Sequence, residues 1–448
     1  MQELVSSSGF RGLAMDEISP DLCMEIGLAL SGAASGPYVV GHDTRLSSPL
    51  LKQALITGLN EGGSDAVDLG LMPTPAVAFY SLGRAGGAMV TASHNPPQYN
   101  GIKLFNGRGA SLSQAGYLSL ISGTGSPGLA RWDSLGTPRS GEGLHGYIEH
   151  LASSAKIRRS WRVGLDPGNG ATTITAPMAL SLCGASPSAI NLAPDGTFPG
   201  RGAEPEGAAL SSLCQLVREN GLDVGFAFDG DGDRVAVVDE NGSPVPQDLA
   251  LGFVAARSVR SRGGSRVIVN VDASAVVDLM VESEGGKVQR CRVGDAYVLE
   301  ALMAAGGVFG GEACGAWIHP ELSLCPDGVL SSIVFLNLLE ESGLKPSQIG
   351  RGLPRLHLRR RKIPFTNELK QHVMGPAKVL LTGMFPDAAV TDVDGIRIEL
   401  ADKSWVLVRP SGTEPLIRIT AESSSEVKAD ELATRVSEAV GSLKVGSQ

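Results

Sequence analysis

The chain has 448 residues, of which 42% are hydrophobic and 19% are charged, a balance that is ordinary for a globular protein of about three domains. The formal net charge is −9 and aromatic residues make up only 5%, so neither nucleic acid nor a membrane is expected as a partner. The six cysteines are scattered, no apolar run approaches the ~20 residues that span a bilayer, and no signal peptide is evident at the N-terminus. These features predict a cytoplasmic protein with reduced thiols.

Strand-like apolar runs alternate with helix-like periodic segments along the chain. The expected strands are Tyr38–Gly41, Gly87–Thr91, Arg162–Asp166, Val224–Phe228, Arg266–Val271 and Gly307–Gly310. The expected helices are Pro20–Ala33, Leu50–Glu61, Leu210–Asn220, Ala275–Glu284, Ala296–Ala305, Leu330–Glu341 and Glu426–Leu443. This alternation predicts an α/β chain with mainly parallel sheets, whose ligands bind beyond the carboxyl ends of the strands.

Ser93 lies in the segment Thr91–Pro97, which directly follows one of the expected strands. A serine hydroxyl presented at a strand end, next to His94 and with Lys103 ten residues further on, suits the transfer of a phosphoryl group. An ordinary Ser-His-Asn-Pro turn is the alternative interpretation. We call this segment the serine loop.

A second segment, the aspartate loop, places Asp229, Asp231 and Asp233 at alternate positions with glycines between them and Arg234 next. Three carboxylates in a tight loop offer the hard oxygen ligands that Mg²⁺ prefers. The rival interpretation is a calcium-binding EF-hand, but Arg234 occupies the position where that motif needs glycine, and Val235–Val238 indicates a strand. The pattern therefore favours a magnesium site.

A third segment, the C-terminal loop, runs from Arg409 to Pro415 and is followed by Arg418. Backbone N–H groups around a glycine, two hydroxyls and two guanidinium groups can form a phosphate cradle, although a surface turn is the alternative. The basic run Arg359–Lys362 is interpreted as a solvated face of a strand or linker.

The three loops together resemble the active-site segments of the α-D-phosphohexomutases, and Ser8–Gly12 and Gly41–Arg45 match further segments of that family. The resemblance implies four domains, three related α/β domains with mixed sheets and a smaller α+β C-terminal domain. Gly-, Ser- and Pro-rich stretches at 133–145 and 343–355, and a break near 245–255, fit such a division. We therefore predict domains at residues 1–150, 151–250, 251–352 and 353–448.

The resemblance also implies roles for individual residues. Ser93 is expected to carry the phosphoryl group and to bind one Mg²⁺ together with Asp229, Asp231 and Asp233. The expected catalytic residues are Ser93, Lys103, Arg11, His94 and Arg234. The residues expected to bind the phosphate that is not reacting are Arg409, Ser411, Gly412, Thr413 and Arg418.

The segment Gly311–Ala316, which we call the sugar loop, departs from the family's pattern Gly-Glu-x-Ser-Gly-His. Glu312 is kept, Cys314 replaces the serine and Ala316 replaces the histidine that assists proton transfer. Glu312 and Cys314 are the expected sugar-binding residues. His319 is one candidate to substitute for the missing histidine, and Lys103 is the first candidate to handle the proton.

The expected function is interconversion of a hexose 6-phosphate and a hexose 1-phosphate through phospho-Ser93 and a bound hexose 1,6-bisphosphate, which also acts as activator. Glucosamine phosphate is favoured as substrate, with mannose and glucose phosphates as alternatives. A Mg²⁺-dependent sugar phosphatase and a non-catalytic sugar-phosphate binder are alternatives of other classes. A monomer or homodimer is expected.

Overall fold

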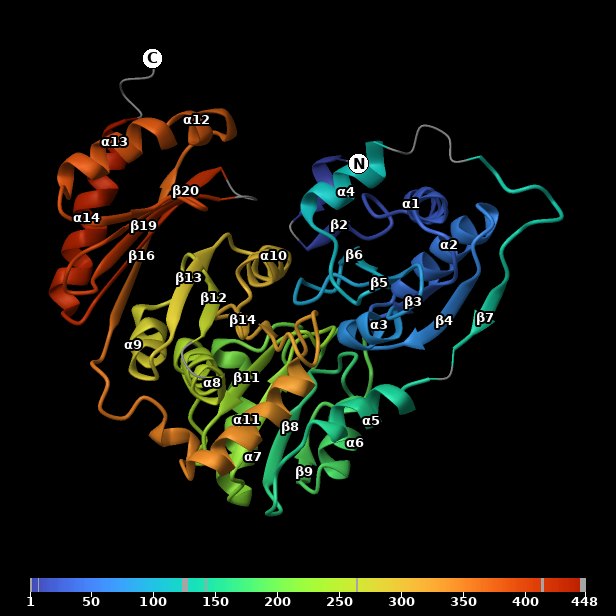
Figure 1. Cartoon of the computed structure of the whole chain (residues 1–448), viewed down its shortest axis with the longest axis horizontal. Helices are drawn as coiled ribbons and strands as arrows, with labels where there is room; N and C mark the ends of the chain where they lie inside the picture. The colour runs from blue at the N-terminus through green and yellow to red at the C-terminus, as the bar shows by residue number, and fades with distance from the viewer. Residues whose placement is uncertain are drawn as a thin grey trace.

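The computed structural model describes residues 2–6, 8–122, 128–141, 143–262, 265–411 and 415–443. Four sheets follow one another along the chain, and Figure 1 shows the bodies built on them arranged in an arc, from the N-terminal body in blue to the C-terminal body in red. We call these bodies domains I to IV. Within the described residues, no helix combines the length and the apolar character that crossing a membrane requires.

Domain I contains a mixed seven-stranded sheet in the order β1-β2-β6-β5-β3-β4-β7. Its strands are β1 (Val5–Ser6), β2 (Gly9–Leu13), β3 (Tyr38–His42), β4 (Ala66–Leu71), β5 (Gly86–Val90), β6 (Tyr99–Asn106) and β7 (Pro138–Ser140). Its helices are α1 (Pro20–Ala33), α2 (Ser48–Glu61), α3 (Thr74–Tyr80) and α4 (Gln114–Ser122). Helix α1 begins at Pro20 because the side chain of Ser19 accepts a hydrogen bond from the N–H of Leu22 and proline suits the first helical position.

Domains II and III each contain a four-stranded mixed sheet, in the orders β11-β10-β8-β9 and β13-β12-β14-β15. The strands are β8 (Arg162–Asp166), β9 (Ser186–Ala189), β10 (Val224–Phe228), β11 (Val235–Val238), β12 (Arg266–Asn270), β13 (Lys287–Cys291), β14 (Phe309–Gly311) and β15 (Trp317–Ile318). The helices are α5 (His145–Ser153), α6 (Thr175–Leu182), α7 (Ser211–Asn220), α8 (Gln247–Arg262), α9 (Ala275–Ser283), α10 (Asp295–Ala305) and α11 (Gly328–Ser342).

Domain IV contains a five-stranded antiparallel sheet in the order β16-β20-β19-β18-β17, packed against helices. Its strands are β16 (His357–Pro364), β17 (Ala389–Thr391), β18 (Ile396–Glu399), β19 (Trp405–Pro410) and β20 (Leu416–Ser423). Its helices are α12 (Asn367–His372), α13 (Met374–Met384) and α14 (Glu426–Ser442). This is the smaller α+β domain that the family resemblance implied.

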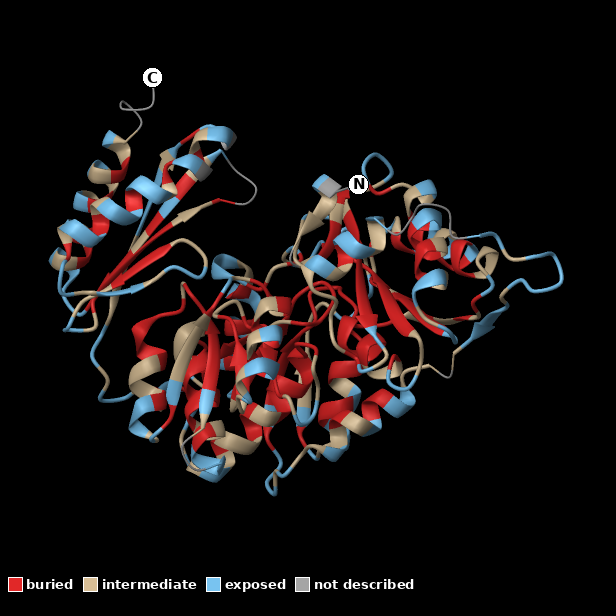
Figure 2. Cartoon of the chain, turned by 45° about the horizontal axis from the view of Figure 1, so that its top comes forward, coloured by how far each residue is buried: buried red, intermediate tan, exposed pale blue. Residues whose placement is uncertain are grey.

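The buried core does not divide evenly among the four domains. One cluster of buried apolar side chains runs from domain I into domains II and III, and the ring of Phe335 in α11 contacts those of Phe226 in domain II and Phe253 in domain III. Domain IV has a separate cluster around its own sheet. Figure 2 shows the buried strands in red beneath the more exposed helices. Domain IV is therefore less tightly joined to the rest of the chain.

The four-domain α/β architecture is confirmed, and the expected helices and strands are present with shifts of a few residues at their ends. The expectation of mainly parallel sheets is confirmed for domains II and III, but domain I pairs as many strands antiparallel as parallel and domain IV is antiparallel throughout. Strands β5 and β6 pair antiparallel, as do β10 and β11, because each pair is joined by a loop too short for the crossover that parallel strands need. These two short connections are the serine loop and the aspartate loop. The boundaries at residues 150, 250 and 352 stay predictions, and the first two of these positions lie within α5 and α8.

Candidate active site

A single wide cleft of about 1550 Å³ is lined by residues of all four domains. The expected site residues on its wall are Arg11, Ser93, His94, Lys103, Asp233, Arg234, Glu312, Cys314, Arg409 and Ser411. Asp229 and Asp231 are fully buried behind this wall. The fold therefore brings together segments that lie up to 400 residues apart in the sequence.

Ser93 has a left-handed backbone conformation, with φ of +52°, which a residue other than glycine adopts only when its surroundings hold it. The buried guanidinium of Arg45 provides that support. It donates hydrogen bonds to the carbonyl oxygens of Ser93, Asn95 and Pro96, each at 2.7 Å, and to that of Tyr99 at 3.0 Å. One arginine thus holds the backbone of the whole serine loop.

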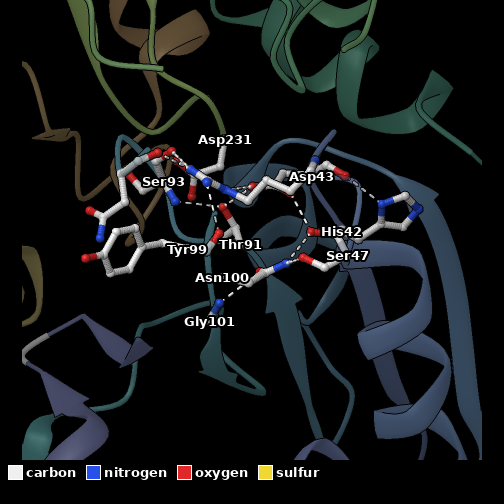
Figure 3. Close-up of polar contacts among 12 residues, drawn as sticks. His42, Asp43, Ser47, Thr91, Ser93, Tyr99, Asn100, Gly101 and Asp231 are labelled. Atoms are coloured by element: carbon white, nitrogen blue, oxygen red, sulfur yellow. Dashed lines mark hydrogen bonds and ion pairs between the residues drawn. The ribbon is translucent and has the colours of Figure 1, made fainter. Parts of the chain in front are cut away.

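Asp43 contacts both Arg45 and Thr91, the two residues that hold the backbone around Ser93, as Figure 3 shows. Its carboxylate pairs with Arg45 Nε at 3.0 Å and accepts a hydrogen bond from Thr91 Oγ1 at 2.7 Å, while Thr91 Oγ1 accepts from the N–H of Ser93 at 2.9 Å. His42 points away from Ser93 and contacts the carbonyl of Asp43 through Nδ1. The segment Gly41–Arg45 therefore supports the serine loop from beneath.

The serine loop meets the aspartate loop directly. Ser93 Oγ donates a hydrogen bond to Asp229 Oδ2 at 2.7 Å. Asp229, Asp231 and Asp233 each present a carboxylate oxygen, and these three atoms lie within 4.8 Å of one another. Lys103 Nζ donates to Asp231 Oδ2 at 2.8 Å and also to Asp233 Oδ2. Five residues expected to share one reaction centre thus lie together.

The three aspartates fit a bound divalent cation. Burial and the repulsion among the carboxylates raise the pKa values of Asp229 and Asp233 above their ordinary range. The Oδ1 atoms of Asp231 and Asp233 are buried and accept no hydrogen bond from any described residue. Buried, crowded oxygens without donors are the ligands that a hard metal ion needs. The aspartate loop can therefore hold a metal ion.

Lys103 is a buried cation in this arrangement. Burial lowers its pKa, but attraction to Asp231 and Asp233 outweighs burial, and the net effect raises the pKa above its ordinary value. The side chain therefore carries a proton and a positive charge where a phosphoryl group on Ser93 would lie. Its part in proton transfer stays a prediction.

Three further expected residues surround Ser93. His94 Nδ1 lies 3.4 Å from Ser93 Oγ, and burial together with the charges of Arg234 and Arg11 lowers the pKa of His94 to about 2. Arg11 Nη1 donates to Asn95 Oδ1 at 3.4 Å, and Arg234 Nη1 donates to Glu204 Oε1 at 3.1 Å. The serine hydroxyl thus has a neutral imidazole and two guanidinium groups around it.

The sugar loop follows β14 and carries Glu312 into the cleft. Glu312 Oε1 accepts hydrogen bonds from Asn270 Nδ2 at 2.8 Å and from the N–H of Gly294 at 2.9 Å, and burial raises its pKa to about 7. Burial likewise raises the pKa of the Cys314 thiol to about 12, so this side chain is neutral. His319 is not among the cleft residues, and its buried ring contacts Ser331 Oγ through Nε2. Its substitution for the missing histidine stays a prediction.

On the opposite wall, Arg409 and Ser411 of the C-terminal loop face the cleft. Gly412 and Thr413 lie outside the described residues. Arg418 is placed beside Arg409 on the neighbouring strand β20 and is not part of the described cleft wall. The phosphate-binding role of this loop stays a prediction.

The basic run on β16 is not uniformly solvated as expected. Arg359 and Arg361 lie on one face of the strand and pair with Glu426 and Asp430 of α14, whereas Arg360 lies on the other face and lines the cleft. Successive side chains of a strand point to opposite faces, so Arg360 faces away from Arg359 and Arg361, although all three residues are of the same type.

Sequence reasoning missed three residues that hold the site together. Arg45 holds the serine loop, Thr74 donates to Asp231 across domains I and II, and Asp394 joins domains III and IV. The match over Gly41–Arg45 was the only signal for Arg45. Thr74 and Asp394 act on partners far away in the sequence and leave no local pattern.

Comparisons with known proteins agree with this geometry. The chain matches the four parts of one family, described as "Phosphoglucomutase/phosphomannomutase", with alpha/beta/alpha domain I at residues 2–120, domain II at 145–242, domain III at 249–356 and the C-terminal domain at 368–439. These matches contain the serine, aspartate, sugar and C-terminal loops in that order.

Two curated relatives and two solved structures are similar over almost the whole chain. A protein of Pyrococcus abyssi described as "Probable phosphoglucosamine mutase" is 40% identical, and one of Methanopyrus kandleri with the same description is 39% identical, each over 96% of both chains. A phosphoglucomutase/phosphomannomutase family protein from Burkholderia thailandensis is 26% identical over 100% of this chain and 99% of that chain, with a TM-score of 0.87. A phosphoglucomutase from Paramecium is 18% identical over 98% and 94% of the two chains, with a TM-score of 0.77, and shares the fold.

Proposed function

Because the chain belongs to the phosphoglucomutase/phosphomannomutase family, we propose that it interconverts glucosamine 6-phosphate and glucosamine 1-phosphate. The observation that carries the proposal is the contact between Ser93 Oγ and Asp229 Oδ2, 2.7 Å long, at a cleft whose opposite wall presents Arg409 and Ser411. A phosphoryl carrier and a phosphate cradle that face each other suit a reaction in which one phosphate reacts while another is held.

In the proposed reaction Ser93 begins as phosphoserine. A hydroxyl oxygen of the sugar phosphate forms a bond to phosphorus, the bond between phosphorus and Ser93 Oγ breaks, and the hydroxyl proton passes, in net balance, to Ser93 Oγ. The product is a sugar 1,6-bisphosphate. Lys103, Arg11 and Arg234 offset the negative charge of the moving phosphoryl group, and they are already in place before the substrate arrives. A Mg²⁺ ion at Asp229, Asp231 and Asp233 would supply further charge neutralisation.

The second half of the reaction returns the other phosphate to Ser93, which requires the bisphosphate to turn over without leaving. The cleft of about 1550 Å³ exceeds the ~300–1,000 Å³ of ordinary small-molecule pockets, so a bisphosphate has room to turn. In either orientation Arg409 and Ser411, with the predicted contributions of Gly412, Thr413 and Arg418, would hold the phosphate that is not reacting. Added hexose 1,6-bisphosphate would activate the enzyme by phosphorylating Ser93.

The preference for glucosamine rests on Glu312 and on the names of the relatives. A carboxyl group buried to 6% exposure binds an ammonium group well, because the ion pair is shielded from water. The 2-amino group of glucosamine phosphate would bring such a charge. The neutral thiol of Cys314 provides no charged partner, so of the two expected sugar-binding residues Glu312 is the one that would recognise the amine.

Phosphorus NMR on the purified protein with Mg²⁺ and a trace of hexose 1,6-bisphosphate tests the proposal. Glucosamine, mannose and glucose 6-phosphates are offered separately, and we expect a 1-phosphate signal that appears fastest with glucosamine. Fastest turnover of mannose or glucose would replace the proposed substrate, release of inorganic phosphate alone would indicate a phosphatase, and no change with any sugar would indicate a binding protein. Ser93→Ala should abolish turnover.

Three finer expectations accompany the proposal. Phosphorylation of Ser93 should appear as an added phosphoryl mass on the intact chain, and it should be absent from Ser93→Ala. Sedimentation should give a monomer or homodimer, and cell fractionation should place the protein in the cytoplasm.

A further inference from the structure

Asp394 joins domain III to domain IV at the wall of the cleft. It lies in the turn between β17 and β18, and a single carboxylate oxygen, Oδ2, accepts two hydrogen bonds. One comes from the backbone N–H of Val293 in domain III at 3.0 Å, and the other from Arg409 Nε in domain IV at 2.9 Å. The expected phosphate-binding arginine is thus tied to the backbone of a different domain.

The domain III partner of Asp394 lies on the cleft wall next to Glu312 of the sugar loop. Val293 is followed by Gly294, whose N–H donates to Glu312 Oε1 at 2.9 Å. Two successive backbone N–H groups therefore point at two carboxylates, one from domain IV and one from the sugar loop. A short line of hydrogen bonds leads from Glu312 through this peptide segment to Asp394 and on to Arg409.

The turn that carries Asp394 is pressed against the strand that carries Arg409. Gly395 has φ of +91°, and a Cβ atom at this position would lie 2.4 Å from the carbonyl oxygen of Val408 and 3.0 Å from Arg409 Cα. Only glycine allows this approach. The side chains of Asp394 and Arg409 are 18% and 22% exposed, so water screens their ion pair less than it screens a surface pair.

We propose that Asp394 is a positioning residue that orients Arg409 toward the phosphate and couples phosphate binding to the placement of Val293–Gly294, the segment that contacts Glu312. Asp394 holds the guanidinium through Nε, so the contact does not use the two Nη groups with which arginine grips a phosphate. A phosphate can therefore bind Arg409 while Asp394 keeps its contacts with Arg409 Nε and with the N–H of Val293, so the phosphate and domain III are joined through one carboxylate. The inference rests on the proposed function for its ligand class, a sugar bisphosphate.

A purely structural role for Asp394 would predict loss of stability without a selective loss of ligand binding. The positioning role predicts a selective loss of ligand binding without a loss of stability, because the effect must pass through Arg409. Asp394→Asn keeps the shape of the side chain and an acceptor oxygen for Val293, but it removes the charge that holds Arg409. Asp392→Asn is a matched control, since Asp392 lies two residues away, is 56% exposed and pairs with Lys378.

Calorimetric titration of the protein with glucose 1,6-bisphosphate tests the inference without depending on turnover. We expect Asp394→Asn to weaken binding by about tenfold, Asp392→Asn to leave it within about twofold, and both to melt close to the unaltered protein. In an Arg409→Gln background, Asp394→Asn should add less than about twofold, because its target is gone.

Equal weakening by Asp394→Asn in the presence and absence of Arg409, or no weakening at all, would overturn the inference. The same would follow from a loss of binding matched by a fall in melting temperature. Turnover is measured separately. If the protein binds the bisphosphate and shows the expected pattern but converts no hexose phosphate, the proposed function fails while the role of Asp394 stands.

Discussion

Replacement of Thr74 by valine tests how domain I holds the carboxylates of domain II that are expected to bind a metal ion. Thr74 begins α3, its N–H donates to the carbonyl oxygen of Asp231 at 2.8 Å, and its hydroxyl donates to Asp231 Oδ2 at 2.5 Å. Lys103 donates to the same Oδ2 atom. The two donors fix the carboxylate so that Oδ1, which has no hydrogen-bond partner among the described residues, is left for a metal ion.

The expected size of the effect follows from the bond that is lost. Valine fills the same space as threonine and keeps the backbone N–H, so only the hydroxyl bond to a charged group disappears. Such a bond contributes about 1.5–3 kcal/mol. Residues that orient metal ligands typically change metal affinity by about 10- to 100-fold, which is the same range of free energy. We therefore expect Thr74→Val to raise the dissociation constant for Mg²⁺ by about 10- to 100-fold.

Calorimetric titration with Mg²⁺, in the absence of any sugar phosphate, measures this constant directly. Thr74→Ser is the matched control, since it keeps the hydroxyl and should bind Mg²⁺ within about threefold of the unaltered protein. Both variants should unfold at similar temperatures in EDTA. If valine and serine weaken Mg²⁺ binding equally, or if neither changes it, the hydroxyl does not orient Asp231 and the reasoning is refuted.

Three other changes have definite expected outcomes. Lys103→Met leaves Asp231 and Asp233 without their cation, so the free energy of unfolding in EDTA should fall by about 3–5 kcal/mol, and added Mg²⁺ should restore part of it in urea titrations. Because the pKa of Glu312 is raised from 4.5 to about 7, the folded chain holds the extra proton between these values. Its free energy of unfolding should fall as the pH rises through that window, by about 3 kcal/mol. Glu312→Gln should reduce the difference in the free energy of unfolding between about pH 5 and pH 8 by this contribution, and urea titrations measure it. Arg45→Leu leaves the carbonyls of the serine loop without their shared donor, so faster amide hydrogen exchange is expected at Asn95 and Tyr99, with no such change in domain IV.

The sequence was sufficient to predict the loops whose chemistry is local. The serine loop and the aspartate loop were recognisable because each gathers its reactive side chains within a few residues of a strand end. Long helices such as α1 and α14 were predictable as well, since each combines a clear period with a serine at its N-cap.

What sequence reasoning missed depends on contacts between distant segments. Thr74 and Asp231 lie 157 residues apart, and Arg45 acts on carbonyl oxygens about 50 residues away that every residue type carries. Strands of two or three residues, such as β7 and β15, are too short to show a period. The pattern of strands and helices alone did not predict the mixed sheets. The serine loop and the aspartate loop each reverse the direction of the chain, a property that side-chain composition does not encode.

The bonds that assemble the catalytic centre also join domains I and II. Ser93 to Asp229, Lys103 to Asp231, and Thr74 to Asp231 all cross that boundary, and a shared apolar core lies behind them. Separation of these two domains would therefore break the site itself.

Domain IV shares neither an extensive apolar core nor the bonds around Ser93 with its neighbour. Its apolar core is separate, and a small apolar cluster joins it to domain III. Among the hydrogen bonds between the two domains are that of Asp394 with Val293 and those that Arg397 Nη1 donates to the carbonyls of Val271 and Ala273. Glu422 Oε2 also accepts a hydrogen bond from the N–H of Ala275. A change in the width of the cleft costs least where the fewest apolar contacts are broken. The wall that carries Arg409 is thus the one that can move while the centre around Ser93 stays intact, as the proposed turning of a bound bisphosphate would require.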